Sequence, residues 1–372
     1  MIRGRFHFVS ARSFVTYLVI GLWSAHVYAG QNYTLTQLTP PGESPLPSVR
    51  GVGITSWGLV VGTYVDNTNG YTHGFVKSAS GTYTTLDPPG SIHTSISGVT
   101  DTSRVFGWSY DANEIATNFY VDLKVGKFVI VQPPKAPPPS PTGIPSAYLT
   151  AANNSGLVAG YYYDTNIVPH GFFFDGKNYA AIDAPGATMG TLLVTINDKW
   201  EAGGSYTTSD GKNHGYTYVG GKFQTVDPPN SNFTNTIVTS INNVGDVVGN
   251  FTDTTGKANG FLLRGGKYTI IAPPNALSTN VNAINDNGVI VGGFATTLPN
   301  GSKGTLGFTL TSEGYAVLNF PFPPPPNANV YNGGFPVVAV NSLGWIVANY
   351  GYITAGFPIG QDYQYSYVGI PK

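Results

Sequence analysis

The most constraining feature of this sequence is a short apolar phrase that recurs through most of the chain. Each copy has apolar residues around a glycine or alanine, usually with an aromatic residue shortly after it. The copies occupy residues 59–64, 105–108, 157–161, 202–206, 247–251, 290–294 and 346–350. Their anchor residues are 62, 107, 160, 204, 249, 292 and 348, so the spacings are 45, 53, 44, 45, 43 and 56 residues. A period of this size indicates a repeat protein.

Each repeat, taken as the 43–56 residues around one anchor, contains four short runs separated by turn residues. A phrase such as residues 284–288 precedes the anchor run, and we expect its Asn, Asp and Gly to supply the positive φ of a tight hairpin. A polar loop then leads to a phrase such as His-Gly-Phe at 73–75, and a glycine turn leads to a last run such as 83–87. Four-stranded units of this length are β-propeller blades. The sequence therefore predicts an all-β fold, a seven-bladed β-propeller of four-stranded blades that forms one domain over residues 30–372.

Loop length predicts the order of strands in a blade and the closure of the ring. The third and fourth runs are joined by tight turns such as residues 80–81, so they are the outer pair, and proline pairs such as residues 88–89 mark the crossing to the next blade. The three inner runs occur seven times, but outer runs occur eight times, from residues 33–38 to residues 365–368. A terminal strand therefore closes the ring. We favour the N-terminal strand, which removes an exposed edge, over the C-terminal one.

The first residues predict a cleaved export signal. Arg3, Arg5 and Arg12 precede an apolar run at 14–23, and small residues follow at 27–29. This run is too short for a membrane span, which needs about 20 residues. We predict a signal peptide over residues 1–29 and a mature protein that is secreted, periplasmic or extracellular, with no transmembrane segment. The chain has no Cys, so an exported protein of this kind depends on packing for its stability.

Composition excludes several classes of protein. Only 10% of residues are charged and 13% are aromatic, and such a sequence lacks the Glu and Lys that exposed helical faces need. With 41% hydrophobic residues the chain is not intrinsically disordered. Removing three Arg from 18 basic residues leaves 15 against 19 acidic ones, so the mature protein is not a basic nucleic-acid binder.

Three phrases resemble a known repeat family. The His-Gly-Phe phrase at 73–75, the Asp-Pro-Pro-Gly crossing at 87–90 and the Ile-Asn-Asp-Asn-Gly hairpin at 284–288 are similar to the HAF repeats of exported bacterial proteins. The resemblance covers about residues 33–358 and is specific in the first, fourth, fifth and sixth repeats. It departs where Gly replaces the Ala of His-Ala-Phe and where the His is lost in the second, fifth, sixth and seventh repeats. The resemblance implies export and a repeat fold, and it assigns no chemistry to named residues.

Three histidines look like candidate metal ligands. His73, His170 and His214 begin equivalent strands of different repeats. Equivalent positions are separated around a ring, whereas a zinc site needs three or four ligands around one ion. We therefore predict no metal site, and we expect each histidine to cap a strand and to hydrogen-bond to a neighbouring turn.

Carboxylates give two further candidate sites with structural alternatives. Asp87, Asp183 and Asp227 could be glycosidase acids, which work in pairs, but their place before the crossings favours turn initiation. The oxygen-rich loops at 66–70 and 253–257 could bind a cation, yet neither has the pattern of a calcium loop. No nucleophile elbow, phosphate loop or His-Glu-Xaa-Xaa-His motif occurs. We predict no cofactor and no catalytic residue.

Loop length also predicts where a ligand binds. The hairpins after the first and third strands are short, whereas the other two connections are long. Strand direction alternates, so both long connections emerge on one face, the long-loop face, and the hairpins emerge on the other, the short-hairpin face. Loops on a rigid scaffold commonly carry function. The candidate ligand-binding residues near the long loops are Tyr71, His73, His93, His170, His214, Phe233 and Tyr331.

These observations favour a non-catalytic, monomeric binding or scaffold propeller that recognises an extracellular carbohydrate or protein partner. The main alternative is a carbohydrate-active enzyme, a glycosidase or lyase, and a third is a purely structural cell-surface protein. A single site that breaks the repeat would distinguish an enzyme from a binder that uses repeated sites.

Overall fold

The structure is a computed structural model that describes residues 33–42, 48–138, 145–228, 233–298, 301, 303–318, 328–329, 337–354 and 362–372. The expected signal peptide at 1–29 and the candidate Tyr331 lie outside the described residues. So does the Ala-Gly-Phe phrase at 355–357, which is the counterpart of His-Gly-Phe in the seventh repeat. All the regular structure of the described residues is β-strand. No helix in this part of the chain is long and apolar enough to cross a membrane.

The strands form antiparallel groups of four in chain order. The first groups are β2 (Val49–Ile54), β3 (Val60–Val65), β4 (Thr72–Lys77) and β5 (Tyr83–Thr85), then β6 (Ser91–Val99), β7 (Arg104–Asp111), β8 (Ala116–Asp122) and β9 (Lys127–Val131), then β10 (Ala147–Ala152), β11 (Val158–Tyr163), β12 (Pro169–Phe174) and β13 (Tyr179–Ile182). The next are β14 (Thr191–Ile196), β15 (Ala202–Thr207), β16 (Asn213–Val219) and β17 (Lys222–Thr225), then β18 (Phe233–Ile241), β19 (Val247–Asp253), β20 (Ala258–Arg264) and β21 (Lys267–Ile271), then β22 (Ser278–Ile284), β23 (Ile290–Thr297), β24 (Lys303–Thr311) and β25 (Gly314–Leu318). The last is β27 (Val337–Val340), β28 (Ile346–Thr354), β29 (Asp362–Pro371) and β1 (Tyr33–Gln37), with β26 (Ala328–Asn329) beside β28.

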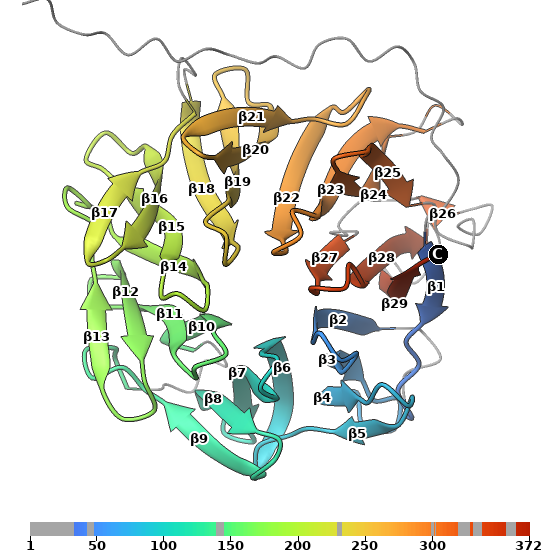
Figure 1. The fold of residues 1–372 in the computed structure, drawn as a ribbon. Helices are drawn as coiled ribbons and strands as arrows, with labels where there is room; N and C mark the ends of the chain where they lie inside the picture. The colour runs from blue at the N-terminus through green and yellow to red at the C-terminus, as the bar shows by residue number, and fades with distance from the viewer. Residues whose placement is uncertain are drawn as a thin grey trace, which may run out of the picture.

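Each group is a four-stranded blade, which we name after its first strand. The blades are arranged around a ring with their first strands innermost (Figure 1). The β14 and β18 blades are joined into one eight-stranded sheet by a single parallel pair of residues, Asn213 and Asn235. Consecutive strands within a blade are joined by short connections. We expected the loops between second and third strands to be long, but residues 254–257 between β19 and β20 are fewer than residues 242–246 in the hairpin between β18 and β19. The long connections of the long-loop face are therefore the crossings between blades, such as residues 183–190 between β13 and β14.

The recurring anchor glycine has a steric cause. In each blade the first strand has a register shift opposite the anchor, for example between Leu149 and Ala151 opposite Gly160. A Cβ on Gly160 would clash with the main-chain oxygen of Tyr148. The same clash with the first strand would occur at Gly62, Gly107, Gly204, Gly249 and Gly292. The repeated glycine therefore marks the close approach of a bulged first strand.

The last blade contains both ends of the described chain. β29 pairs with β28, with Tyr367 opposite the anchor Ala348, and β1 pairs with the other edge of β29. Tyr367 thus has the position that the Phe of His-Gly-Phe has in other blades. Residues 365–368, which we expected to form an outer strand, lie in the third strand instead, because β1 takes the outer position. The additional outer run in the sequence is therefore not a spare strand.

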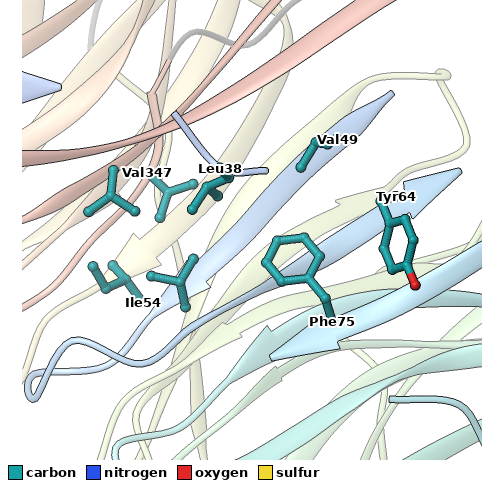
Figure 2. Packing of buried hydrophobic residues seen from close by; sticks show 8 residues of the cluster. Leu38, Val49, Ile54, Tyr64, Phe75 and Val347 are labelled. Atoms are coloured by element: carbon teal, nitrogen blue, oxygen red, sulfur yellow. The ribbon is translucent and has the colours of Figure 1, made fainter. Parts of the chain in front are cut away.

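The hydrophobic core is divided into clusters between neighbouring blades. Tyr64 and Phe75 of the β2 blade pack with Val347 of the β27 blade and with Leu38, which follows β1 (Figure 2). Phe75 is 1% exposed. Burying such a side chain stabilises the fold by about 1.5–3 kcal/mol. The third-strand aromatic residues of the repeat, such as Phe75, therefore contribute to the packing between blades.

Buried asparagines link the hairpins that join first and second strands. Asn242, 3% exposed, accepts hydrogen bonds at Oδ1 from the main-chain N–H groups of Val244 and Asp246. Its Nδ2 donates to the main-chain oxygen of Asn285 in the next blade, at 3.0 Å. The same link is made by Asn153, Asn197, Asn285 and Asn341. We refer to these five residues as the asparagine belt. Of the Asn, Asp and Gly that we expected to supply the positive φ of these hairpins, the glycine does so, as at Gly245, and the belt asparagines do not.

Candidate functional site

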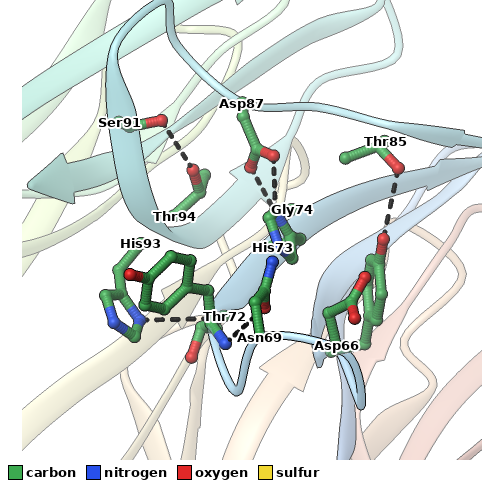
Figure 3. Close-up of polar contacts among 12 residues, drawn as sticks. Asp66, Asn69, Thr72, His73, Gly74, Thr85, Asp87, Ser91, His93 and Thr94 are labelled. Atoms are coloured by element: carbon green, nitrogen blue, oxygen red, sulfur yellow. Dashed lines mark hydrogen bonds and ion pairs between the residues drawn. The ribbon is translucent and has the colours of Figure 1, made fainter. Parts of the chain in front are cut away.

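The three candidate histidines make the same contacts in their blades. His73 Nδ1 lies 2.6 Å from a carboxylate oxygen of Asp87, and the His73 ring lies 5.6 Å from the ring of Tyr64, between centroids. The main-chain N–H of Gly74 donates to the other oxygen of Asp87, so that Asp87 bonds both residues (Figure 3). The same ring and carboxylate contacts are made by Tyr162, His170 and Asp183 and by Tyr206, His214 and Asp227.

This arrangement fastens the start of each third strand to the end of the outer strand. We expected the aspartate to initiate its own turn, but Asp87 and Asp227 instead accept hydrogen bonds from the third strand. Each histidine is therefore a strand cap that bonds a neighbouring segment. Because the contacts repeat, they belong to the architecture, and a ligand-binding role for His73, His170 and His214 stays a prediction.

The second strands carry side chains that break the repeat near the long-loop face. One and three positions after the anchor, the β6 blade has Trp108 and Tyr110, and the β10 blade has Tyr161 and Tyr163. The other blades have no ring there: their residues are Thr63 and Val65, Ser205 and Thr207, Asn250 and Thr252, Gly293 and Ala295, and Asn349 and Gly351. The fold does not require aromatic residues at these positions, so their presence in two adjacent blades needs another explanation.

Four rings form a continuous row between the β2 and β6 blades. Tyr71, in the loop before β4, lies 5.1 Å from His93 in β6, between ring centroids. His93 stacks on Tyr110 at 4.5 Å, and Tyr110 stacks on Trp108 at 6.1 Å. Tyr71 is 38% exposed and the other three side chains are half-buried. We refer to these four residues as the aromatic row. It brings together two of the sequence-based candidates, Tyr71 and His93.

His93 is the polar member of the row and its environment favours the neutral ring. Its Nδ1 accepts a hydrogen bond from the main-chain N–H of Thr72 at 3.1 Å, so its proton is on Nε2 (Figure 3). Burial lowers the pKa of His93, and the nearby His73 lowers it further. Near neutral pH the row therefore offers ring faces and an imidazole N–H donor without a positive charge.

The oxygen-rich loops use their carboxylates internally. Asp66 Oδ1 accepts hydrogen bonds from the main-chain N–H and the hydroxyl of Thr68. Asp253 Oδ1 bonds Thr255 in the same way and also accepts from the main-chain N–H of Lys257. These bonds lower the pKa of both carboxyl groups. Among the described residues, no three His, Asp or Glu side chains gather as around a metal ion.

The two remaining candidates do not join the row. Phe233 begins β18, where it pairs with Asp253 of β19, several blades away from the row in chain order. Tyr331 lies outside the described residues. The sequence reasoning also missed Trp108 and Tyr110, although the lack of rings at the equivalent repeat positions is visible in the sequence.

Two exposed indoles lie on the opposite, short-hairpin face. Trp57 is 46% exposed and its Nε1 donates to the main-chain oxygen of Asp101 in the next blade. Trp200 is 53% exposed and has a φ of 66°. The equivalent positions of most other hairpins hold a glycine with positive φ, such as Gly58 and Gly245. A bulky residue in this conformation is an outlier, and Trp200 was not among the sequence-based candidates.

Comparison with solved structures shows the β-propeller fold. The β-propeller domain of the Trilobed protease from Pyrococcus furiosus aligns over 87% of this chain and 94% of that chain, with 9% identity and a TM-score of 0.54. A six-bladed lectin from Aleuria aurantia aligns over 75% of this chain and 97% of that chain, with 12% identity and a TM-score of 0.39. AofleA from Arthrobotrys oligospora aligns over 77% and 87%, with 12% identity and a TM-score of 0.40. No family model matches the chain, and no curated protein matches its sequence. The fold of the chain is thus an all-β propeller of four-stranded blades.

Proposed function

We propose that this protein is an exported, non-catalytic binding propeller that holds a neutral saccharide on the aromatic row. The observation that carries the proposal is that the row breaks the repeat on the long-loop face. Residues that the fold needs recur from blade to blade, whereas Trp108 and Tyr110 have no aromatic counterparts in most blades. The row is continuous and partly exposed, so it offers a ligand several adjacent ring faces.

The chemistry of the row favours a neutral ligand. Ring faces pack against apolar C–H surfaces, while the tyrosine hydroxyls and the His93 N–H hydrogen-bond to hydroxyl groups. The carboxylates nearby are unfavourable for an anionic ligand. Burial raises the pKa of Tyr110, and the charge of Glu114 raises it further. Asp66 is also close enough to interact electrostatically with His73. Binding single-stranded nucleic acid requires basic side chains beside the stacking rings. A saccharide with both C–H faces and hydroxyl groups fits these features.

The proposal also includes the number of blades and the way in which the ring is closed. The strand pairing supports seven blades closed by the N-terminal strand, because β1 provides the outer strand of the β27 blade. Asn341 supports a closed ring as well, since it donates from the last blade, the β27 blade, to the main-chain oxygen of Thr55 in the β2 blade. Export as a HAF-like repeat protein rests on the basic and apolar N-terminal sequence and on the repeated phrases.

The experiment is a glycan-array screen of the mature chain, followed by calorimetry with the best neutral saccharide. Tyr71→Ala is expected to weaken binding at least severalfold and to change the free energy of unfolding by less than about 1 kcal/mol, because Tyr71 is an exposed loop residue. Trp57→Ala is the matched control, an exposed ring on the opposite face. Equal binding by wild type and Tyr71→Ala, or loss in Trp57→Ala alone, would contradict the proposed site.

Turnover assays on the same saccharide test the rival enzyme. A glycosidase needs two carboxylates in defined geometry, and Asp66 and Asp87 are bonded to Thr68 and to His73 and Gly74. We expect no release of reducing ends. Measurable hydrolysis or elimination would replace the binding function with the carbohydrate-active alternative.

A further inference from the structure

The β10 blade, which is adjacent to the β6 blade, carries a second group of aromatic side chains. Tyr148 of β10 stacks on Tyr161 of β11, with ring centroids 5.3 Å apart. Tyr163 meets both rings edge-on, at 6.4 Å from Tyr148 and 5.7 Å from Tyr161. We refer to these three residues as the tyrosine trio. Like the row, the trio lies near the long-loop end, because Tyr148 is near the start of a first strand and Tyr163 ends a second strand.

The trio and the row have equivalent places in adjacent blades. Trp108 is paired with Ser95 of its first strand, and Tyr161 is paired with Tyr148. Tyr110 and Tyr163 each follow two positions later on the second strand. The two groups are therefore related by one step around the ring, and only the β6 and β10 blades have rings at these second-strand positions among the described blades.

Core packing does not account for the trio. Its three side chains are half-buried, and none of them belongs to the buried clusters between blades, which contain the neighbouring Tyr162 instead. Burial raises the pKa of Tyr161 to about 12, with further contributions from Tyr163 and Tyr148. Burial also raises the pKa of Tyr148, so the hydroxyl groups of Tyr148 and Tyr161 are neutral at physiological pH. The trio offers neutral rings and hydroxyls, the same chemistry as the row.

We propose that the tyrosine trio is a second subsite, so that the ligand of this propeller is an extended neutral oligosaccharide that crosses from the β6 blade to the β10 blade. This inference rests on the proposed function of the row. A chain-like ligand contacts both subsites at once, and the second contact then forms at high effective concentration. Affinity should therefore increase with the length of the oligosaccharide until both subsites are filled.

The test measures affinity by calorimetry along ladders of gluco-, manno- and xylo-oligosaccharides, from disaccharide to hexasaccharide. The double variant Tyr161→Ser, Tyr163→Thr introduces the residues that the β14 blade has at these positions, Ser205 and Thr207. We chose these replacements because a neighbouring blade folds with them. Thr207→Ala is the matched control in a blade without rings, and thermal unfolding checks that every variant is folded.

The wild type and Thr207→Ala are expected to bind the hexasaccharide on the order of tenfold more tightly than the disaccharide, and the double variant to lose this gain. Saccharide binding that does not depend on length in the wild type, or a gain that the double variant keeps, would overturn the second subsite and leave the row as the only site. Absence of binding to every neutral saccharide, with binding to a proline-rich peptide instead, would overturn the proposed function itself.

Discussion

The two faces of this propeller differ in how far their side chains depart from the repeat. On the short-hairpin face, the asparagine belt repeats the same buried hydrogen bond from blade to blade, between Asn153 and Asn197 as between Asn242 and Asn285. On the long-loop face, the aromatic row and the tyrosine trio are confined to neighbouring blades. A contact that joins neighbouring blades recurs in the sequence. Side chains outside the repeat are not required for the ring, and they are therefore the better candidates for function.

The largest expected effect concerns the repeated anchor. Gly249→Ala should lower the free energy of unfolding by about 3 kcal/mol, because the new Cβ would clash with the main-chain oxygen of Ile237 and with Phe261. Ala348→Gly is the control, since the last blade already accommodates a Cβ at its anchor. Urea unfolding measures both. A small effect of Gly249→Ala would show that the bulge does not impose the glycine.

The second prediction concerns the belt. Asn242→Ala should destabilise the fold by about 2 kcal/mol, because it removes the link to Asn285 and leaves the buried N–H of Asp246 without its partner. Asn243→Ala at the half-buried neighbouring position removes solvent-exposed bonds to Asp198 and Asp286 and should cost less than about 1 kcal/mol. Equal losses in the two variants would contradict the structural role of the belt.

The third prediction concerns Trp200, which departs from the repeat on the short-hairpin face. Trp200→Gly should raise the free energy of unfolding by about 1 kcal/mol, because glycine adopts a φ near 66° without the strain of a bulky residue. Thermal unfolding of the purified variant measures the change. A loss of stability would show that the Trp200 side chain has a packing role, despite its exposure.

The smallest expected effect is the pH dependence of stability that His93 contributes on the long-loop face. The folded pKa of His93 lies below its ordinary value of 6.5, so the unfolded chain takes up a proton first as the pH falls. This contribution to stability is complete above about pH 6.5 and is lost as the pH falls toward the folded pKa. The melting temperature should therefore decrease less between pH 7 and pH 5.5 in His93→Gln than in the wild type. The same decrease in both would contradict the lowered pKa.

The sequence predicted the fold class because the pattern of four strands and their turns is local and recurs in each repeat. It predicted the histidines as strand caps, but not their aspartate partners, because His73 and Asp87 lie at the two ends of a hairpin and an Asp before Pro also forms turns. The belt residues were predicted only as turn formers, a role that Asn242 has through Val244 and Asp246. Their links between blades were missed, since the acceptors are 43 or more residues away in the chain. Residues 365–368 have the same alternating pattern in a third strand as in an outer one. Pairing with β1, rather than local sequence, decides between them.

Half of the aromatic row was predicted from the sequence. Tyr71 and His93 flank long connections, whereas Trp108 and Tyr110 lie inside a strand, where an aromatic residue is usually assigned to the core. Comparing equivalent positions in the repeat would have identified both Trp108 and Tyr110. Apart from the β10 blade, with Tyr161 and Tyr163, the other blades have no aromatic residue one or three positions after the anchor.

Hydrogen–deuterium exchange with and without a saturating neutral oligosaccharide tests the central claim most directly. Bound ligand should slow exchange where it restrains the chain. We predict added protection around Tyr71, His93 and Trp108, and none in the hairpins at residues 55–58 and 197–201 on the opposite face. Protection of those hairpins, with exchange around the aromatic row unchanged, would contradict the assignment of function to the residues that break the repeat.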